Sequence, residues 1–132
     1  MEQINENRKF DLEERLIDFA AIIIEVTESL ANTRAGNHLA GRLVRSGTSP
    51  ALQYGEAQSA ESRNDFIHKL QILLKELRES LVNLKLIKKV SLSSKMKLVN
   101  DGMTGCNQLI SIFVKSVETA RKNNISRKTE QK

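Results

Sequence analysis

The stretch RSGTSPALQYGEA, residues 45–57, decides how this chain folds. It gathers glycine, serine, threonine and proline in a short window, a composition that suits a linker, a phosphate-binding loop, a catalytic turn or an unusual helix. A Walker-type loop needs a lysine after its second glycine, and this stretch contains no lysine. A nucleophile elbow needs a serine flanked at two positions by glycines, and that order is also missing. The sequence therefore favours a helix.

Helical spacing supports this interpretation. Steps of three and four residues join a stripe of small and aromatic side chains, namely Ala40, Val44, Gly47, Ala51 and Tyr54, with Gly55 and Ala57 nearby. Such a stripe lets a second helix approach closely. Pro50 opposes a helix, because it removes one hydrogen bond and costs about 3 kcal/mol. Nearby hydroxyl groups or water can satisfy the freed backbone groups, so we predict a kinked but continuous helix over residues 33–60.

Three further segments have the apolar spacing of amphipathic helices, at residues 11–31, 63–89 and 94–122. The first carries the stripe Leu12, Leu16, Phe19, Ile23, Val26 and Leu30. The segment over residues 63–89 is rich in leucine, with Ile67, Leu74 and Leu86 widening its apolar face, and Ser62 is its expected N-cap. Residues 123–132 are polar and aperiodic, and we expect a disordered tail. We predict one all-α domain over residues 1–132, an antiparallel up-down-up-down four-helix bundle with a Pro-kinked second helix.

Antiparallel pairing of the second and third helices makes specific contacts testable. With a turn near residues 60–62, facing residues have numbers that sum to about 123, given the equal rise of the two helices. Arg45 then faces Glu76 or Glu79. Glu56 faces His68 or Lys69.

Charge is distributed unevenly along the 132 residues, whose formal net charge is +5. Residues 1–33 carry eight acids and three bases, whereas residues 67–90 carry two acids and six bases. An acidic beginning and a basic second half suit either contact between subunits or a surface for nucleic acid. The N-terminus lacks the apolar run of a signal peptide, and no stretch is long enough to span a bilayer. We expect a cytoplasmic protein with no membrane contact.

A longer segment around the opening stretch, residues 38–81, reads HLAGRLVRSGTSPALQYGEAQSAESRNDFIHKLQILLKELRESL. It resembles the signature of the four helix bundle protein family, which includes the 23S rRNA intervening-sequence proteins encoded in bacterial rRNA insertions. The family is related to the accessory variability determinants of diversity-generating retroelements. The resemblance covers about residues 10–120, and Pro50 stands where many relatives carry an aliphatic residue. The motif positions are Arg45, Ser46, Gly47, Thr48, Pro50, Gly55, Glu56, Asp65, His68 and Glu76.

The resemblance implies an up-down-up-down bundle that forms a homo-oligomer, a ring-like pentamer, with a positively charged surface or channel. It also implies a link to nucleic acid and no enzymatic activity. Seven basic residues of the second and third helices are candidates for phosphate contact: Arg34, Arg42, Arg45, Lys69, Lys75, Arg78 and Lys85. The alternative for each is a solvated face or an ion pair between helices. Few aromatic residues are present for base stacking, so structured RNA is the favoured ligand.

Catalytic and metal sites find little support. His38 and His68 are thirty residues apart, and neither has the Glu three positions earlier that metal-binding bundles use, although Asp65 lies three before His68. We expect His68 to be at least half-buried and hydrogen-bonded, and Cys106, the single cysteine, to be a core residue. We therefore expect no catalytic residue, no metal and no cofactor.

Two functions remain open at this point. The first is a non-catalytic oligomeric bundle that binds ribosomal or other structured RNA through its basic surface. The second is a protein–protein interaction module, such as an accessory subunit of a nucleic-acid enzyme, in which the acidic first helix pairs with basic later helices and nucleic acid is not bound directly.

Overall fold

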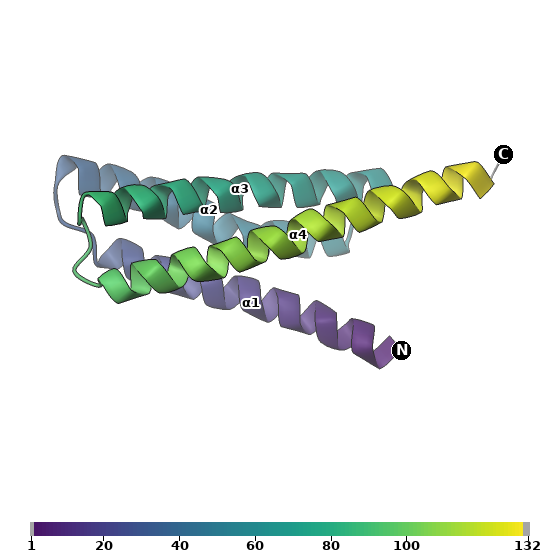
Figure 1. Cartoon of the computed structure of the whole chain (residues 1–132), viewed down its shortest axis with the longest axis horizontal. Helices are drawn as coiled ribbons and strands as arrows, with labels where there is room; N and C mark the ends of the chain where they lie inside the picture. The colour runs from purple at the N-terminus through teal and green to yellow at the C-terminus, as the bar shows by residue number, and fades with distance from the viewer. Residues whose placement is uncertain (1, 131–132) are drawn as a thin grey trace.

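The computed structural model describes the backbone of residues 2–130 and the side chains of residues 11–124. It contains four helices, α1 (Glu2–Glu28), α2 (Arg34–Gln58), α3 (Arg63–Lys89) and α4 (Met96–Glu130). Each helix packs beside its neighbours in chain order, and α1 also packs beside α4 (Figure 1). The all-α antiparallel four-helix bundle predicted from the apolar spacing is confirmed.

The outer helix boundaries differ from the prediction. Helix α1 begins at Glu2 instead of residue 11, and α4 continues to Glu130 instead of residue 122. The backbone of residues 123–130 thus continues α4 where a disordered tail was predicted, while residues 131–132 lie outside the described part. Both extensions lack glycine and proline and contain Glu, Arg and Lys, which favour helix without an apolar stripe. An apolar stripe marks the packed part of a helix and does not mark its end.

Short polar side chains define the starts of α2 and α3. The backbone N–H of Gly36 donates to Thr33 Oγ1 at 3.0 Å, and the N–H of Asp65 donates to Ser62 Oγ at 3.0 Å. Each hydroxyl satisfies one of the amide groups that a helix leaves unpaired in its first turn. The predicted N-cap at Ser62 is confirmed, and α3 has the predicted bounds.

The core lies along the bundle axis and is formed by the predicted stripes. Among its members are Leu16, Ile23, Leu77 and Phe113, each with at most 1% of its surface exposed. Leu86 and Val44, which the spacing placed on apolar stripes, are instead exposed by 47% and 37%. Each lies beside a core residue of its own helix, about 100° further round, where no neighbouring helix covers it. Within residues 2–130, no helix has the length and apolar character needed to cross a bilayer.

Helix α2 passes through Pro50 without a break, as predicted for residues 45–57. The hydroxyls of Thr48 and Ser49 donate to the carbonyls of Val44 and Arg45, each at 2.7 Å. These bonds reach carbonyls just before that of Ser46, the group that loses its partner to proline, so they do not replace the missing bond. Hydroxyl bonding of this kind favours local bending, and the extent of the kink stays a prediction.

The loops at one end of the bundle are joined to each other. Ala31 N–H donates to the Leu92 carbonyl at 2.9 Å, and the hydroxyls of Ser29 and Ser93 lie 2.6 Å apart. Ser91 has a φ of 52°, the left-handed conformation that turns the chain after α3. The α1–α2 and α3–α4 connections therefore close one end together, whereas α1 begins and α4 ends at the other (Figure 1).

Candidate nucleic-acid interface

The α2–α3 hairpin brings together the charged residues of the motif. Arg45 pairs with Glu76 at 3.2 Å and with Glu79 at 2.7 Å, while Arg42 pairs with Glu79 at 2.6 Å. The contact of Arg45 with Glu76 and Glu79 is the one that antiparallel pairing predicts. The register of the two helices was therefore correctly derived from the sequence.

Two partners were predicted for Glu56, His68 or Lys69, and the structure shows Lys69. Lys69 is half-buried and its Nζ lies 3.1 Å from Glu56 Oε2. His68 is exposed, which contradicts the expectation of a buried or half-buried hydrogen-bonding residue. The reason is rotation around α3: Lys69 points toward α2, and the preceding residue lies about 100° away on the outer surface. Asp65, three residues earlier, is half-buried in the first turn of α3.

Small residues of the motif lie at the contacts between helices. Ser46 is fully buried, and Ser80 Oγ donates to Ser46 Oγ at 2.9 Å, which links α2 to α3. Gly47 faces α1, where an added Cβ would lie 2.9 Å from Ile23 Cβ. The slim stripe predicted for α2 is thus correct at Gly47. It is wrong at Gly55, which is exposed and whose added Cβ would meet no atom within 4 Å.

Ion pairing shifts the pKa values of Glu79 and Arg45 in this cluster. The hydrogen bond from Arg42, followed by the charge of Arg45, lowers the pKa of Glu79 below its ordinary value. The charges of Glu76 and Glu79 raise the pKa of Arg45 in turn. The side chains of Arg42 and Arg45 remain about half exposed, at 52% and 54%. The cluster is therefore a solvent-facing network that fixes the hairpin and favours the charged form of Arg45.

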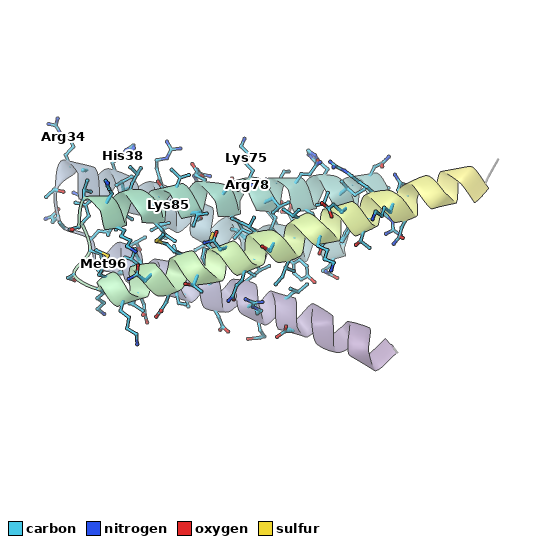
Figure 2. All side chains as sticks on the ribbon, viewed as in Figure 1. Arg34, His38, Lys75, Arg78, Lys85 and Met96 are labelled. Carbon is cyan, nitrogen blue, oxygen red and sulfur yellow. The ribbon has the colours of Figure 1, made fainter. Side chains whose placement is uncertain are left out.

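The seven candidate phosphate ligands fall into two groups. Arg42, Arg45 and Lys69 are engaged with glutamates. The other four are exposed and make no ion pair among the described side chains: Arg34, Lys75, Arg78 and Lys85. Figure 2 shows Arg34 and Lys75 projecting away from the bundle on the side of α2 and α3.

Two further cations belong to the same surface and were not among the candidates. Lys88 and Lys89 are exposed in the last turn of α3. The sequence contained a signal for Lys89, because Lys75, Arg78, Lys85 and Lys89 follow helical steps that keep them on one side of the helix. We call the exposed cations of α3 the basic face, formed by Lys75, Arg78, Lys85, Lys88 and Lys89.

Aromatic side chains contribute nothing to this surface. Tyr54 is 6% exposed and meets Phe113 edge-to-face, with ring centroids 5.7 Å apart. Burial, and after it the charge of Glu13, raises the pKa of Tyr54. Phe19 is also buried and Phe66 is half-buried near the start of α3, so the basic face itself carries no Phe, Tyr or Trp ring for base stacking. Any nucleic acid on the basic face is held by charge and shape.

Residues that commonly carry chemistry are separated. Cys106 is fully buried, its Sγ donates to the Leu77 carbonyl at 3.1 Å, and burial raises its pKa to about 12. This confirms that Cys106 is a core residue. Both histidines are exposed, and the part of the chain described by the structure brings no three His, Cys, Asp or Glu side chains into a metal-binding group.

Comparison with known proteins places the fold. No family model matches the chain, and no curated protein matches its sequence significantly. Among solved structures, it is similar to a protein of unknown function from the S23 ribosomal protein family of Bacteroides thetaiotaomicron VPI-5482. The two share 25% sequence identity with a TM-score of 0.73, over 80% of this chain and 97% of that one. This structural match agrees with the resemblance in residues 38–81, and the chain is similar in fold to this member of the S23 ribosomal protein family.

Proposed function

We propose that this bundle is a non-catalytic protein that binds structured RNA through the basic face and the neighbouring Arg34. The observation that carries the proposal is the sign of the exposed charge on α3. Setting His68 aside, every exposed ionisable residue of α3 is a lysine or an arginine, and the acids of that helix are half-buried. Four of its exposed cations, Lys75, Arg78, Lys85 and Lys89, share one side of the helix and can neutralise several phosphates at once.

Structured RNA suits this surface better than single-stranded RNA. Recognition of single strands relies on stacking of bases on exposed aromatic rings, and the basic face offers no Phe, Tyr or Trp ring. The cations of α3 gather on one side of the helix, and such a surface suits contact with duplex phosphates that does not read the bases. We propose ribosomal or other structured RNA as the ligand and expect little dependence on base sequence.

Salt titration of binding tests the proposal. We expect a duplex RNA fragment to bind at low salt, with a steep linear fall of log K against log salt concentration. Replacing Lys75, Arg78 and Lys85 by glutamine removes three phosphate contacts, and the magnitude of the slope is expected to fall by about two to three units. Replacing Lys95, Lys97 and Lys122, exposed cations of the α3–α4 loop and α4, is the matched control. Equal loss in both triple variants, or no binding at low salt, contradicts the proposal.

A second candidate is a protein–protein interaction module that acts without binding nucleic acid. It is favoured by exposed large apolar side chains, including Leu52 at 70% and Val82 at 57%, because such residues in groups commonly mark interaction sites. The homo-oligomer and the pentamer implied by the family resemblance are compatible with either candidate and stay predictions. Light scattering of the purified chain gives the mass that tests them.

A further inference from the structure

The end of the bundle opposite the joined loops, here called the open end, contains a cavity of about 570 Å³. It is lined by Asp11 and Leu12 of α1, by Arg63 and Phe66 of α3, and by side chains within residues 112–123 of α4. Figure 1 shows α1 diverging from α4 toward the N-terminus at this end. Cavities of about 300–1,000 Å³ commonly hold small molecules, so the size of this one suits a ligand.

Apolar side chains that line the cavity are left partly uncovered. Leu12 and Phe66 begin the apolar stripes of α1 and α3, and both are half-buried. The next members of those stripes, Leu16 and Leu70, are 0% and 1% exposed. Ile112 of α4 is half-buried in the same cavity. The stripes therefore continue past the point where the helices close around the core, and their first residues form an apolar wall that a ligand can cover.

Charged and polar side chains also line the cavity. Arg63 and Lys115 supply two cations from α3 and α4, and Asp11 supplies one acid from α1. The hydroxyl groups of Ser116 and Thr119 add polar atoms from α4. Two cations and one acid leave a single net positive charge, which a singly charged anion balances. An apolar wall beside this charge suits a molecule that is apolar along its body and negative at one end.

Arg63 is the cation that most needs a partner. It is the first residue of α3, it is half-buried, and it makes no ion pair with any side chain of residues 11–124. The helix dipole disfavours a positive charge in the first turn, and partial burial of an unpaired charge costs free energy. The fold itself therefore gains nothing from an arginine at this position, whereas an anion in the cavity would pair with it.

A second hollow, of about 470 Å³, shares Arg63 and Phe66 with the cavity, and the rest of its lining lies within residues 57–62. The charged residue that these contribute is Glu61, whose carboxylate repels an anion. This hollow also lacks the second cation that Lys115 gives to the cavity. The cavity beside α4 is therefore the better site for an anion.

From these observations we infer that the cavity between α1, α3 and α4 binds a small monocarboxylate with an apolar body. The apolar body covers Leu12, Phe66 and Ile112, and the carboxylate lies at Arg63 and Lys115. Burial of apolar surface supplies affinity, and charge-assisted hydrogen bonds orient the ligand. None of the seven candidate phosphate ligands lines the cavity, so the inference goes beyond RNA binding and does not depend on it.

Calorimetric titration of the full chain with decanoate, below the concentration at which micelles form, tests the site. We expect a dissociation constant on the order of 0.1–1 mM for a ligand of this size. Octanoate is shorter by two methylene groups, and its dissociation constant should be about tenfold higher. Decanol and decylamine keep the apolar body but lack the negative charge, so each should bind at least about fivefold more weakly than decanoate.

Variants of the lining identify the residues that hold the ligand. Arg63→Gln should raise the dissociation constant of decanoate about tenfold, and Lys115→Gln, at an exposed position, about twofold to fivefold. Arg121→Gln removes an exposed cation of α4 outside the lining and should leave it unchanged. Ser116→Leu fills the cavity and should abolish binding, whereas Ser111→Leu makes the same change at an exposed position of α4 outside the lining and should preserve it. Circular dichroism confirms that each variant is folded.

Amide chemical shifts measured by NMR locate the bound ligand. Decanoate should shift amide signals of residues 63–66 and 112–123 and leave those of the basic face in place. The absence of both heat and shifts at low millimolar decanoate overturns the inference, and so does equal binding by the Ser116→Leu and Ser111→Leu variants. Equal affinity for decanol and decanoate overturns the role of the two cations. Tighter binding of decyl phosphate, which carries a second negative charge, overturns the assignment to a monocarboxylate.

Discussion

Two glycines of α2 lie in opposite environments, and they give a prediction at the scale of single residues. A Cβ on Gly47 would lie 2.8 Å from Cγ1 and 2.9 Å from Cβ of Ile23, a branched side chain in the core. Overpacking costs about 1–3 kcal/mol, against about 1 kcal/mol gained in helix propensity. We expect Gly47→Ala to lower the free energy of unfolding by on the order of 1 kcal/mol. Gly55→Ala, in open space, should raise it by about 0.5–1 kcal/mol. Urea denaturation gives both values, and equal signs would contradict the packing described for Gly47.

The lowered pKa of Glu79 predicts that the stability of the bundle depends on pH. Its pKa is lower in the folded chain than its ordinary value of 4.5, first because of the hydrogen bond from Arg42. The ionised form is therefore favoured by folding, and this contribution is present above about pH 4.5 and is lost as the pH falls through the folded pKa. Between pH 6 and pH 3, we expect the free energy of unfolding to fall less for Glu79→Gln than for the wild type. Urea midpoints at the two pH values measure the difference, and parallel curves would refute it.

Cys106 predicts a protected thiol. Burial raises its pKa to about 12, so almost no thiolate forms at pH 8 in the folded chain, and the side chain has no exposed surface. We expect Ellman's reagent to modify less than a tenth of the thiol within minutes under native conditions, and all of it in urea, as an order-of-magnitude contrast. Rapid modification of the folded chain would show that the core opens around α4.

At the scale of elements, Pro50 gives the clearest prediction. Replacing it with alanine restores one backbone donor inside α2 and removes a helix penalty of about 3 kcal/mol. Pro50 is buried, and the loss of about two methylene groups costs about 1.6 kcal/mol. The balance favours Pro50→Ala by about 1 kcal/mol, which thermal unfolding can detect. A lower melting temperature would indicate that the packing of α1 and α3 depends on the local bend.

The sequence predicted the elements well, because spacing of three and four residues identifies the buried side of a helix. The third helix has the predicted bounds, and Arg45 meets Glu76 and Glu79 as the antiparallel register requires. The errors occur at the borders of the apolar stripes. Leu86 and His68 lie next to inward-facing residues, and their exposure depends on how closely the neighbouring helices wrap around α3. Periodicity in one helix carries no information about that distance.

Only part of the candidate site could be predicted, because the partners of its charged residues lie on other helices. The sequence supplied the cations, but the positions of their partners decide which remain available. Arg42 and Arg45 are held by glutamates one helix away, whereas Lys75 and Arg78 face solvent. The antiparallel register of the hairpin accounts for part of this division, since it already pairs Arg45 with Glu76 and Glu79. The cavity at the open end depends on the divergence of α1 from α4, which periodicity does not supply.

At the scale of the whole molecule, ionic strength should separate folding from association. The core is apolar, and the ion pairs among the described side chains lie at the surface, where each contributes about 0–1 kcal/mol. We expect the free energy of unfolding to change little between about 50 and 500 mM salt, while binding of duplex RNA to the basic face weakens because added salt screens the attraction. Urea denaturation and a binding titration on the same samples report the two quantities. Binding that strengthens with salt would contradict a contact held by charge.

The joined loops at one end of the bundle have a practical consequence for experiments on living cells. The hydrogen bonds between residues 29–31 and 92–94 close that end, and the antiparallel order of the helices places the start of α1 and the end of α4 at the other. A fluorescent reporter attached at either terminus would therefore emerge lengthwise from the molecule, leaving the flanks of α1 and α3 accessible.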